Sequence, residues 1–258
     1  MRFSSYIICA TPRSGSTLLC DLLASTRVAG KPHSYYRDED ASYWAELWGV
    51  PLPHRLNDAE FERAYLAAMI REGTAETSVF GVRVMWSSVA DASRRLDAIE
   101  GDHADVADRF AKAFGSTLYI HLSRQDKLAQ AISLIRAEQS GLWHRAADGT
   151  ERERTASHQT PVYDSHRIAE VLRELQNDDV AWTSFFATRG IRPVRLVYEM
   201  FTAAPRTTVT EILSTLGQDP QASERMVVQT SKLADADSLE WAERYRRETC
   251  QDSPARLG

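Results

Sequence analysis

The sequence predicts an α/β fold, a three-layer sandwich built on a mainly parallel central sheet. Two observations support this prediction. Short apolar runs that are typical of buried strands alternate along the chain with longer segments whose apolar residues recur at helical spacing. The first run, from Tyr6 to Ala10, is continuously apolar, as expected for a strand that is covered on both faces. Strands that alternate with helices in this way imply a parallel sheet with helices on both sides.

Each predicted element has a local signal. Leucines at helical spacing follow the first strand and its short loop, and they predict a helix to about residue 26. Four glycines, at 115, 141, 190 and 217, mark the ends of later helices. The predicted strands are 6–10, 79–86, 117–122 and 194–197, and the predicted helices are 18–26, 61–70, 106–114, 126–140, 165–188, 205–216 and 238–249.

Two long segments lack such a pattern. Residues 31–57 are rich in Tyr, Trp, Pro and His, and we interpret them as an irregular excursion that could line a substrate site. Residues 141–161 are polar and charged, and they are predicted to form a mobile loop.

The bulk composition narrows the class of protein. A chain of 258 residues with 43% hydrophobic residues suits one large α/β domain, and we predict a single domain over 1–258. A formal net charge of -5 argues against a general nucleic-acid surface. Three widely spaced cysteines give no disulfide framework, and no spacing of metal ligands occurs, so no metal site is predicted. The first apolar run is too short for a signal peptide or a membrane span, which favours a cytoplasmic protein.

The run Arg13-Ser14-Gly15-Ser16-Thr17 directly follows the first predicted strand. Glycine lets the backbone approach an anion closely, and the unsatisfied amides at the start of the next helix favour negative charge. The three hydroxyl side chains add donors, and Arg13 adds a forked cation. The order of strand, glycine loop and helix therefore predicts an anion-binding loop at the carboxyl edge of the sheet.

Other interpretations of this loop stay open on the motif alone. A plain turn with a Ser/Thr helix cap is common. A P-loop would make the protein a nucleotide kinase, but that loop is longer and ends in Gly-Lys-Ser/Thr, and no lysine precedes the hydroxyl pair here. A further alternative is a non-catalytic module that binds a nucleotide or a glycan.

Longer stretches carry a family resemblance. The stretch CATPRSGSTLLCDLLASTRVAGKP resembles the start of the bacterial Stf-zero-type sulfotransferases, a family of trehalose 2-sulfotransferase-like and lipopolysaccharide sulfotransferase-like enzymes. Further similar stretches are FGVRVMW, LSRQDKLAQAISLIRAEQSGLW, LGQDP and EWAERYRRE. They occur in the family's order, cover nearly the whole chain, and are together more specific than the loop alone.

The resemblance implies a P-loop-kinase-like domain that moves a sulfuryl group from 3'-phosphoadenosine-5'-phosphosulfate (PAPS) to a carbohydrate or glycolipid hydroxyl. It implies that Arg13, Ser14, Gly15, Ser16 and Thr17 hold the 5'-phosphosulfate of this co-substrate. No metal is needed in this family, which is reasonable because amides and a cation can neutralise the phosphosulfate. Related enzymes form dimers, so a homodimer is expected by resemblance.

A second anion site is implied by resemblance at the end of the third predicted strand. In sulfotransferases generally, an arginine at a strand end and a serine on the next helix bind the 3'-phosphate of the donor. Arg124 and Ser133 correspond to them here. The other interpretations are a surface ion pair between Arg124 and Asp126, and an ordinary helix-surface serine at Ser133.

Arg13, Arg83 and His33 are the candidate catalytic residues. Arg83 lies in the strand 79–86, where relatives carry a basic residue. Two interpretations of it are open, a contact with the transferring sulfuryl group and a place on a polar face of the sheet.

The base that takes the acceptor's proton is also open. In related enzymes a Glu in the stretch after the first helix is thought to be that base, and Ser34 stands at its position. His33 is one candidate, because an imidazole has a reference pKa of roughly 6.5. Asp38 or Glu39 is another. In a third alternative, Lys31 or Arg83 stabilises charge on the sulfate and little base help is needed.

Overall fold

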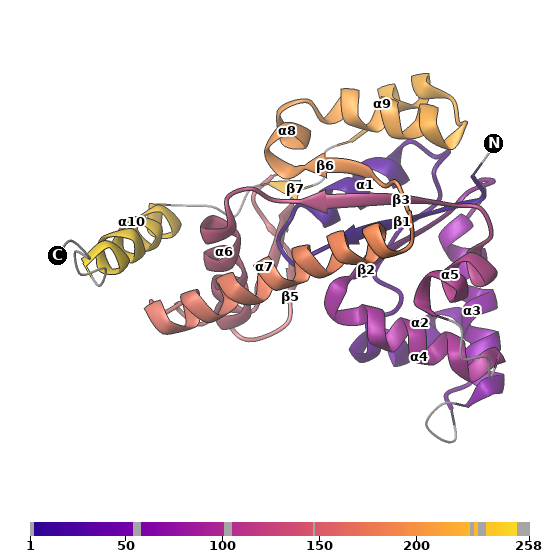
Figure 1. Cartoon of the computed structure of the whole chain (residues 1–258), viewed down its shortest axis with the longest axis horizontal. Helices are drawn as coiled ribbons and strands as arrows, with labels where there is room; N and C mark the ends of the chain where they lie inside the picture. Colours follow the sequence, from indigo (N-terminus) through magenta and orange to yellow (C-terminus); the bar gives the residue numbers. More distant parts are fainter. Residues whose placement is uncertain are drawn as a thin grey trace. The chain divides into compact units, whose positions relative to one another are not determined.

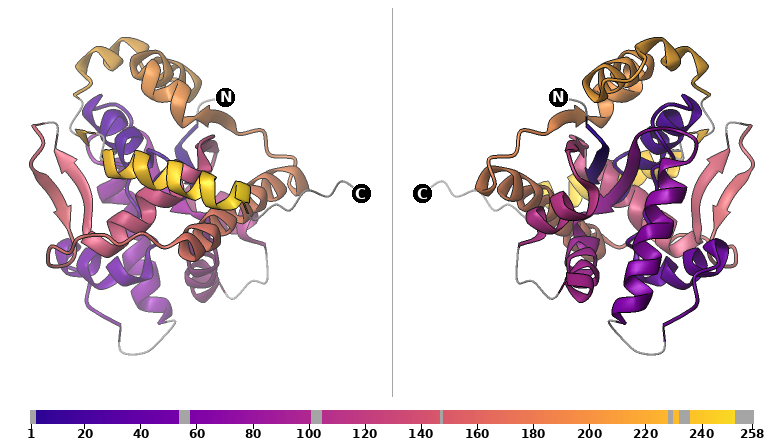
Figure 2. Two further views of the ribbon diagram at one scale, coloured as in Figure 1. Left: turned by 90° about the vertical axis from the view of Figure 1, so that its left-hand side faces the viewer. Right: turned by 90° about the vertical axis from the view of Figure 1, so that its right-hand side faces the viewer.

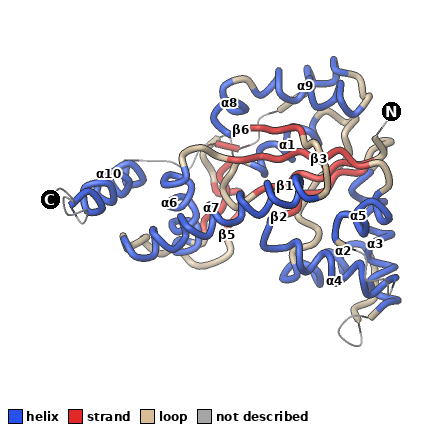
Figure 3. Tube along the Cα trace, viewed as in Figure 1, coloured by secondary structure: helices blue, strands red, loops and turns tan. Residues whose placement is uncertain are grey.

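In the computed structural model, the apolar run Ser5–Ala10 forms β1, a fully buried strand inside a parallel sheet. β2 (Phe80–Met85) pairs with one edge of β1 and β3 (Thr117–Ser123) with the other, and β6 (Val194–Val197) pairs with β3. The strand order is therefore β2-β1-β3-β6, with every pair parallel (Figures 1 and 3). This confirms the predicted parallel sheet, and each strand end lies within one residue of its prediction.

The structure describes residues 3–53, 58–100, 105–146, 148–227, 230–231 and 236–251. The chain divides into two compact units, Met1–Ser123 with Asp178–Val228 and Arg124–Asn177 with Gln229–Gly258. The parallel sheet lies in the first unit, and a smaller antiparallel sheet lies in the second. The single domain over 1–258 stays a prediction.

Helices cover both faces of the parallel sheet. Successive residues of β1 alternate between two cores: Ile7 and Cys9 belong to one, and Tyr6, Ile8 and Ala10 to the other. The first core includes side chains of α3 (Ala59–Thr74), α4 (Val89–Glu100), α5 (Val106–Phe114) and the end of α7 (Ser165–Thr188); the second includes side chains of α1 (Ser16–Ser25), α8 (Tyr198–Ala203) and α9 (Pro205–Leu216). The predicted three layers are therefore confirmed in this unit.

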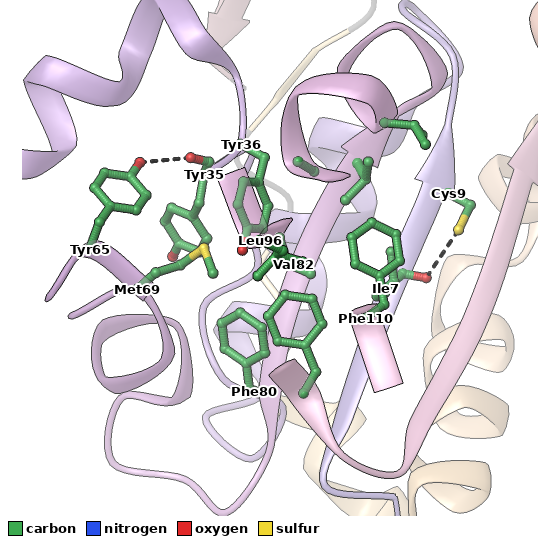
Figure 4. Packing of buried hydrophobic residues seen from close by; sticks show 14 of the residues in the cluster. Ile7, Cys9, Tyr35, Tyr36, Tyr65, Met69, Phe80, Val82, Leu96 and Phe110 are labelled. Carbon is green, nitrogen blue, oxygen red and sulfur yellow. Dashed lines mark hydrogen bonds between the residues drawn. The ribbon is translucent and has the colours of Figure 1, made fainter. Parts of the chain in front are cut away.

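Two hydrogen bonds connect α3 to the segment that follows α1. The Tyr65 hydroxyl donates to the carbonyl of Tyr35 at 2.7 Å, as Figure 4 shows. The backbone amide of Lys31 donates to the carbonyl of Gly73 at 2.7 Å. This segment therefore has fixed anchors although it contains no strand or α-helix before residue 41.

Part of the segment that was predicted to be irregular is helical. A short turn, η1 (Asp38–Asp40), leads into α2 (Ala41–Trp48), and Trp44 and Trp48 pack against the first core. The expectation of an irregular excursion is therefore wrong for these residues, because the same aromatic side chains bury one face of a short helix. Residues 54–57 lie outside the described part of the chain.

The sequence pattern also did not predict α4. Its Arg95 is buried, donates to the carboxylate of Glu62 on α3 at 2.8 Å, and lies 4.1 Å from the centre of the Tyr65 ring. Burial raises the pKa of Glu62, and the neighbouring Arg95 opposes that rise. Removal of either partner would leave the other as an uncompensated buried charge, which is costly.

In the second unit, α6 (Lys127–Ser140), α10 (Ala236–Gln251) and the first part of α7 share a separate core. A three-stranded antiparallel sheet has the order β5-β4-β7, with β4 (Leu142–Ala146), β5 (Glu151–Arg154) and β7 (Thr230–Ser231). Both views of Figure 2 show the hairpin of β4 and β5.

The prediction of a mobile loop over 141–161 is wrong where this hairpin forms. Its cross-strand contacts are largely polar: Trp143 Nε1 donates to Thr155 Oγ1 at 3.0 Å, and His144 Nε2 lies 3.6 Å from the carboxylate of Glu153. Strand prediction rests on alternating apolar residues, so a hairpin with such polar pairs gives little signal.

Within the described residues, no helix is long and apolar enough to cross a membrane. The described residues also contain no cluster of three or more His, Cys, Asp or Glu side chains that could hold a metal ion. The cysteines are free thiols. The cytoplasmic location stays a prediction.

Candidate functional site

The loop between β1 and α1 has the backbone of an anion-binding turn. Gly15, the residue before α1, has φ 88°, and Arg13 has φ 61°, so two left-handed residues flank Ser14. Backbone N–H groups in such turns converge on a concavity that suits an anion. The start of α1, all of it within the described residues, has no side-chain cap and no acidic residue in its first turn. Its first amides are therefore able to bind a negative ligand.

Hydroxyl groups line the same loop. Ser14 is fully buried, and its Oγ has no hydrogen-bond partner among the described residues. A buried hydroxyl without a partner costs free energy on the order of 1–3 kcal/mol, so such a group calls for a ligand or a water. Ser16 is also buried and Thr17 is partly exposed.

The guanidinium of Arg83 meets this loop from β2. Its Nη1 donates to Thr17 Oγ1 at 2.7 Å and to Ser16 Oγ at 3.5 Å, and its Nε donates to Ser34 Oγ at 2.7 Å. Its backbone amide donates to the carbonyl of His33 at 3.0 Å. Five of the residues singled out in the sequence thus lie in one cluster, and Arg83 is not simply on a polar face of the sheet.

Tyr198 is a site residue that sequence reasoning missed. A Cβ added at Gly15 would lie 2.5 Å from Cδ2 of Tyr198, so the aromatic ring lies directly against the glycine. Tyr198 follows β6 and is the first residue of α8. Its signal was its position, because ligands of parallel sheets bind where the strands end at their carboxyl side.

His33 lies beside Ser34 and has an exposed side chain. Its ring contacts Trp44 edge-on, with 4.8 Å between ring centres, and lies 5.7 Å from the ring of Tyr35. We name this group the aromatic cluster; it consists of His33, Tyr35, Tyr43, Trp44 and Trp48. An exposed histidine beside aromatic rings can take a proton and contact an apolar or sugar face.

The two acidic candidates for a base are engaged elsewhere. The carboxylate of Asp38 accepts from Arg94 at 2.6 Å, and that of Glu39 accepts from Arg37 at 3.3 Å. Each of the two carboxylates therefore has an arginine partner. The role of His33 as the base stays a prediction.

A cysteine lies one turn into α1 from the loop. Burial raises the pKa of Cys20 to about 11, and the nearby Arg83 only partly opposes this rise. The thiol is therefore protonated near neutral pH and is no nucleophile.

Arg124 and Ser133 belong to the second unit. Arg124 directly follows β3 and is partly exposed, and Ser133 lies within α6. Asp126 caps α6 by accepting from the amide of Ala129 at 2.9 Å. The binding roles of Arg124 and Ser133 stay predictions.

A loop of amides, hydroxyls and arginine at the carboxyl edge of a parallel sheet is typical of proteins that bind phosphate or sulfate groups. The family model of the Stf0 sulphotransferases matches residues 5–248 of this chain. The chain therefore belongs to the Stf0 sulphotransferase family and is a sulfotransferase.

Named relatives agree with this assignment. The chain is 28% identical to trehalose 2-sulfotransferase of Mycobacterium tuberculosis, over 94% of both chains. It is 26% identical to trehalose 2-sulfotransferase of Mycolicibacterium smegmatis, over 96% of this chain and 97% of that enzyme. Among solved structures, the sulfotransferase domain of the Synechococcus PCC 7002 olefin synthase matches with a TM-score of 0.42 and 19% identity, covering 95% of this chain and 88% of that one.

Gly15→Ala should destabilise the protein by roughly 2–4 kcal/mol, because it combines left-handed strain with a clash against Tyr198. Gly49→Ala is the matched control: its φ is +68° and nothing lies within 4 Å of an added Cβ. We expect the control to lose only about 1 kcal/mol. Urea unfolding measures the free energy of unfolding of both variants. Equal losses would show that the contact between the Tyr198 ring and residue 15 does not contribute to the effect.

Proposed function

We propose that this sulfotransferase moves a sulfuryl group from PAPS to a hydroxyl of a carbohydrate or glycolipid. The observation that carries the proposal is the contact of Arg83 with the hydroxyls of the anion loop. This contact places a cation beside the amides of a helix N-terminus, where a phosphosulfate would be neutralised without a metal.

The donor is held at two places in this proposal. Arg13, Ser14, Gly15, Ser16 and Thr17 bind the 5'-phosphosulfate through amides, hydroxyls and one guanidinium. Arg124 and Ser133 bind the 3'-phosphate, which distinguishes PAPS from ATP. Both sites belong to one sulfotransferase domain over residues 1–258.

The transfer step uses three side chains. The acceptor oxygen attacks sulfur, the bond from sulfur to the bridging oxygen breaks, and its electron pair stays on the 5'-phosphate. Arg13 and Arg83 stabilise the charge that develops there and on the sulfuryl oxygens. His33 takes the proton of the acceptor hydroxyl, and the ion pairs of Asp38 and Glu39 support this choice.

Two observations support a sugar-containing acceptor. The matched mycobacterial relatives are named trehalose 2-sulfotransferases. The aromatic cluster offers exposed faces, since Tyr43 is 61% exposed, and aromatic rings suit the apolar face of a sugar. Trehalose and a lipopolysaccharide-like glycan are both candidates, and the homodimer expected by resemblance stays part of the proposal.

Transfer of ³⁵S-labelled sulfate from PAPS to a panel of glycans, with trehalose included, tests the proposed function. Label on any sugar hydroxyl supports it. Tight binding of PAPS without transfer would instead favour a non-catalytic binding module. Transfer of phosphate from ATP to any acceptor would favour the kinase alternative.

Arg124→Ala should weaken binding of adenosine 3',5'-bisphosphate (PAP) by about 10- to 100-fold, as expected for the loss of a charge-assisted contact. Binding of 5'-AMP, which lacks the 3'-phosphate, should change less than about threefold. Titration calorimetry measures both ligands. Arg206→Ala, at an exposed arginine of α9, is the control. Equal losses for PAP and 5'-AMP would overturn the 3'-phosphate assignment.

His33→Ala should lower kcat by about 10²- to 10⁴-fold and remove the acidic limb of the pH–rate profile, because a general base acts only when unprotonated. The measurement is the pH dependence of ³⁵S transfer to trehalose. His158→Ala, at an exposed histidine of the second unit, should leave both unchanged. An unaltered profile in His33→Ala would exclude His33 as the base.

A further inference from the structure

The Arg83 guanidinium is held by hydroxyl groups alone. Its side chain contacts Ser16, Thr17 and Ser34, and the described residues give it no carboxylate partner. Its third nitrogen, Nη2, has no hydrogen-bond partner among those residues. The side chain is partly exposed, so this nitrogen can reach a ligand.

Hydroxyl partners orient a cation without neutralising it. A carboxylate against the same guanidinium would cancel most of its field, whereas a hydroxyl accepts one hydrogen bond and leaves the charge for an anion. Two other arginines near this segment differ in this respect, because Arg94 is paired with Asp38 and Arg95 with Glu62.

Ser34 is the one of the three hydroxyl partners that does not belong to the anion loop. It is buried, and its Oγ accepts from Arg83 Nε. Among the described residues, no acceptor lies within hydrogen-bond reach of its own O–H. The bond between the Arg83 amide and the His33 carbonyl fixes the segment in register with β2. The backbone therefore fixes the position of Ser34 relative to the Arg83 side chain.

We propose that Ser34 is a positioning residue that aims the Arg83 guanidinium at the donor's sulfate and keeps its charge uncompensated. The inference rests on the proposed function and deepens it. A carboxylate at position 34 would pair with Arg83, whereas the hydroxyl of Ser34 does not neutralise it. Ser34 therefore helps Arg83 to stabilise negative charge on the sulfate and does not take a proton. The proton of the acceptor goes to another group.

Binding of PAPS and of PAP to three variants tests this proposal without a known acceptor. Ser34→Ala should raise the Kd of PAPS about tenfold while the Kd of PAP, which lacks the sulfate, changes less than about twofold. Ser34→Thr, which keeps the hydroxyl, should restore PAPS binding to within about threefold. Ser34→Glu should weaken PAPS binding more than Ser34→Ala does, because the carboxylate pairs with Arg83.

The controls separate this proposal from the proposed function. Ser214→Ala, at an exposed serine of α9, should leave both affinities unchanged. Circular dichroism checks that each variant is folded, and Ser34→Thr and Ser34→Glu carry the test if Ser34→Ala is not.

Two outcomes overturn the positioning role while the proposed function stands. One is an unchanged ratio of the two Kd values in Ser34→Ala or Ser34→Glu. The other is faster ³⁵S transfer to trehalose by Ser34→Glu, with a new acidic limb in its pH profile. Wild-type protein that binds neither PAPS nor PAP overturns the proposed function itself, and this inference with it.

Discussion

The candidate site depends on the contact of the Arg83 guanidinium with hydroxyl groups from two other segments. Arg83 stands on β2, Thr17 on the first turn of α1, and Ser34 on the segment after that helix. A forked cation can satisfy several acceptors at once in a fixed geometry, which a lysine could not do equally well. One side chain thereby joins the anion loop to the segment that bears His33.

The buried core gives this contact its rigidity. β1 is inaccessible along its whole length, and the carbonyl of its last residue, Ala10, accepts from Trp182 Nε1 at 3.0 Å. Trp182 is itself fully buried and stacks on Phe186. Close-packed side chains of this kind resist displacement, so the loop that begins one residue later starts from a fixed point. On the other side of the site, Tyr65 holds the carbonyl of Tyr35.

Local signals in the sequence predicted most of the fold and located the loop of the candidate site. The four parallel strands and the loop from Arg13 to Thr17 follow from apolar runs, glycine and hydroxyl residues that lie next to one another in the chain. The contact of Arg83 with Ser34 joins residues 49 positions apart, and the ring of Tyr198 on Gly15 joins residues still further apart. No periodicity encodes such contacts. The prediction was wrong at the polar hairpin of β4 and β5 for a different reason. The two strands lack the alternation of apolar and polar residues on which strand prediction rests.

The backbone at Arg13 shows what the loop requires of its residues. A left-handed conformation costs a non-glycine residue roughly 1–2 kcal/mol, and glycine would adopt it almost without strain. Gly15 meets that need two residues later, where the ring of Tyr198 leaves no room for a side chain. Arginine at position 13 has this strained conformation although glycine would suit it better, and it adds a cationic side chain to the loop before α1. Because this loop has no lysine like that of a nucleotide-binding P-loop, its charge comes from arginines, Arg13 within it and Arg83 beside it.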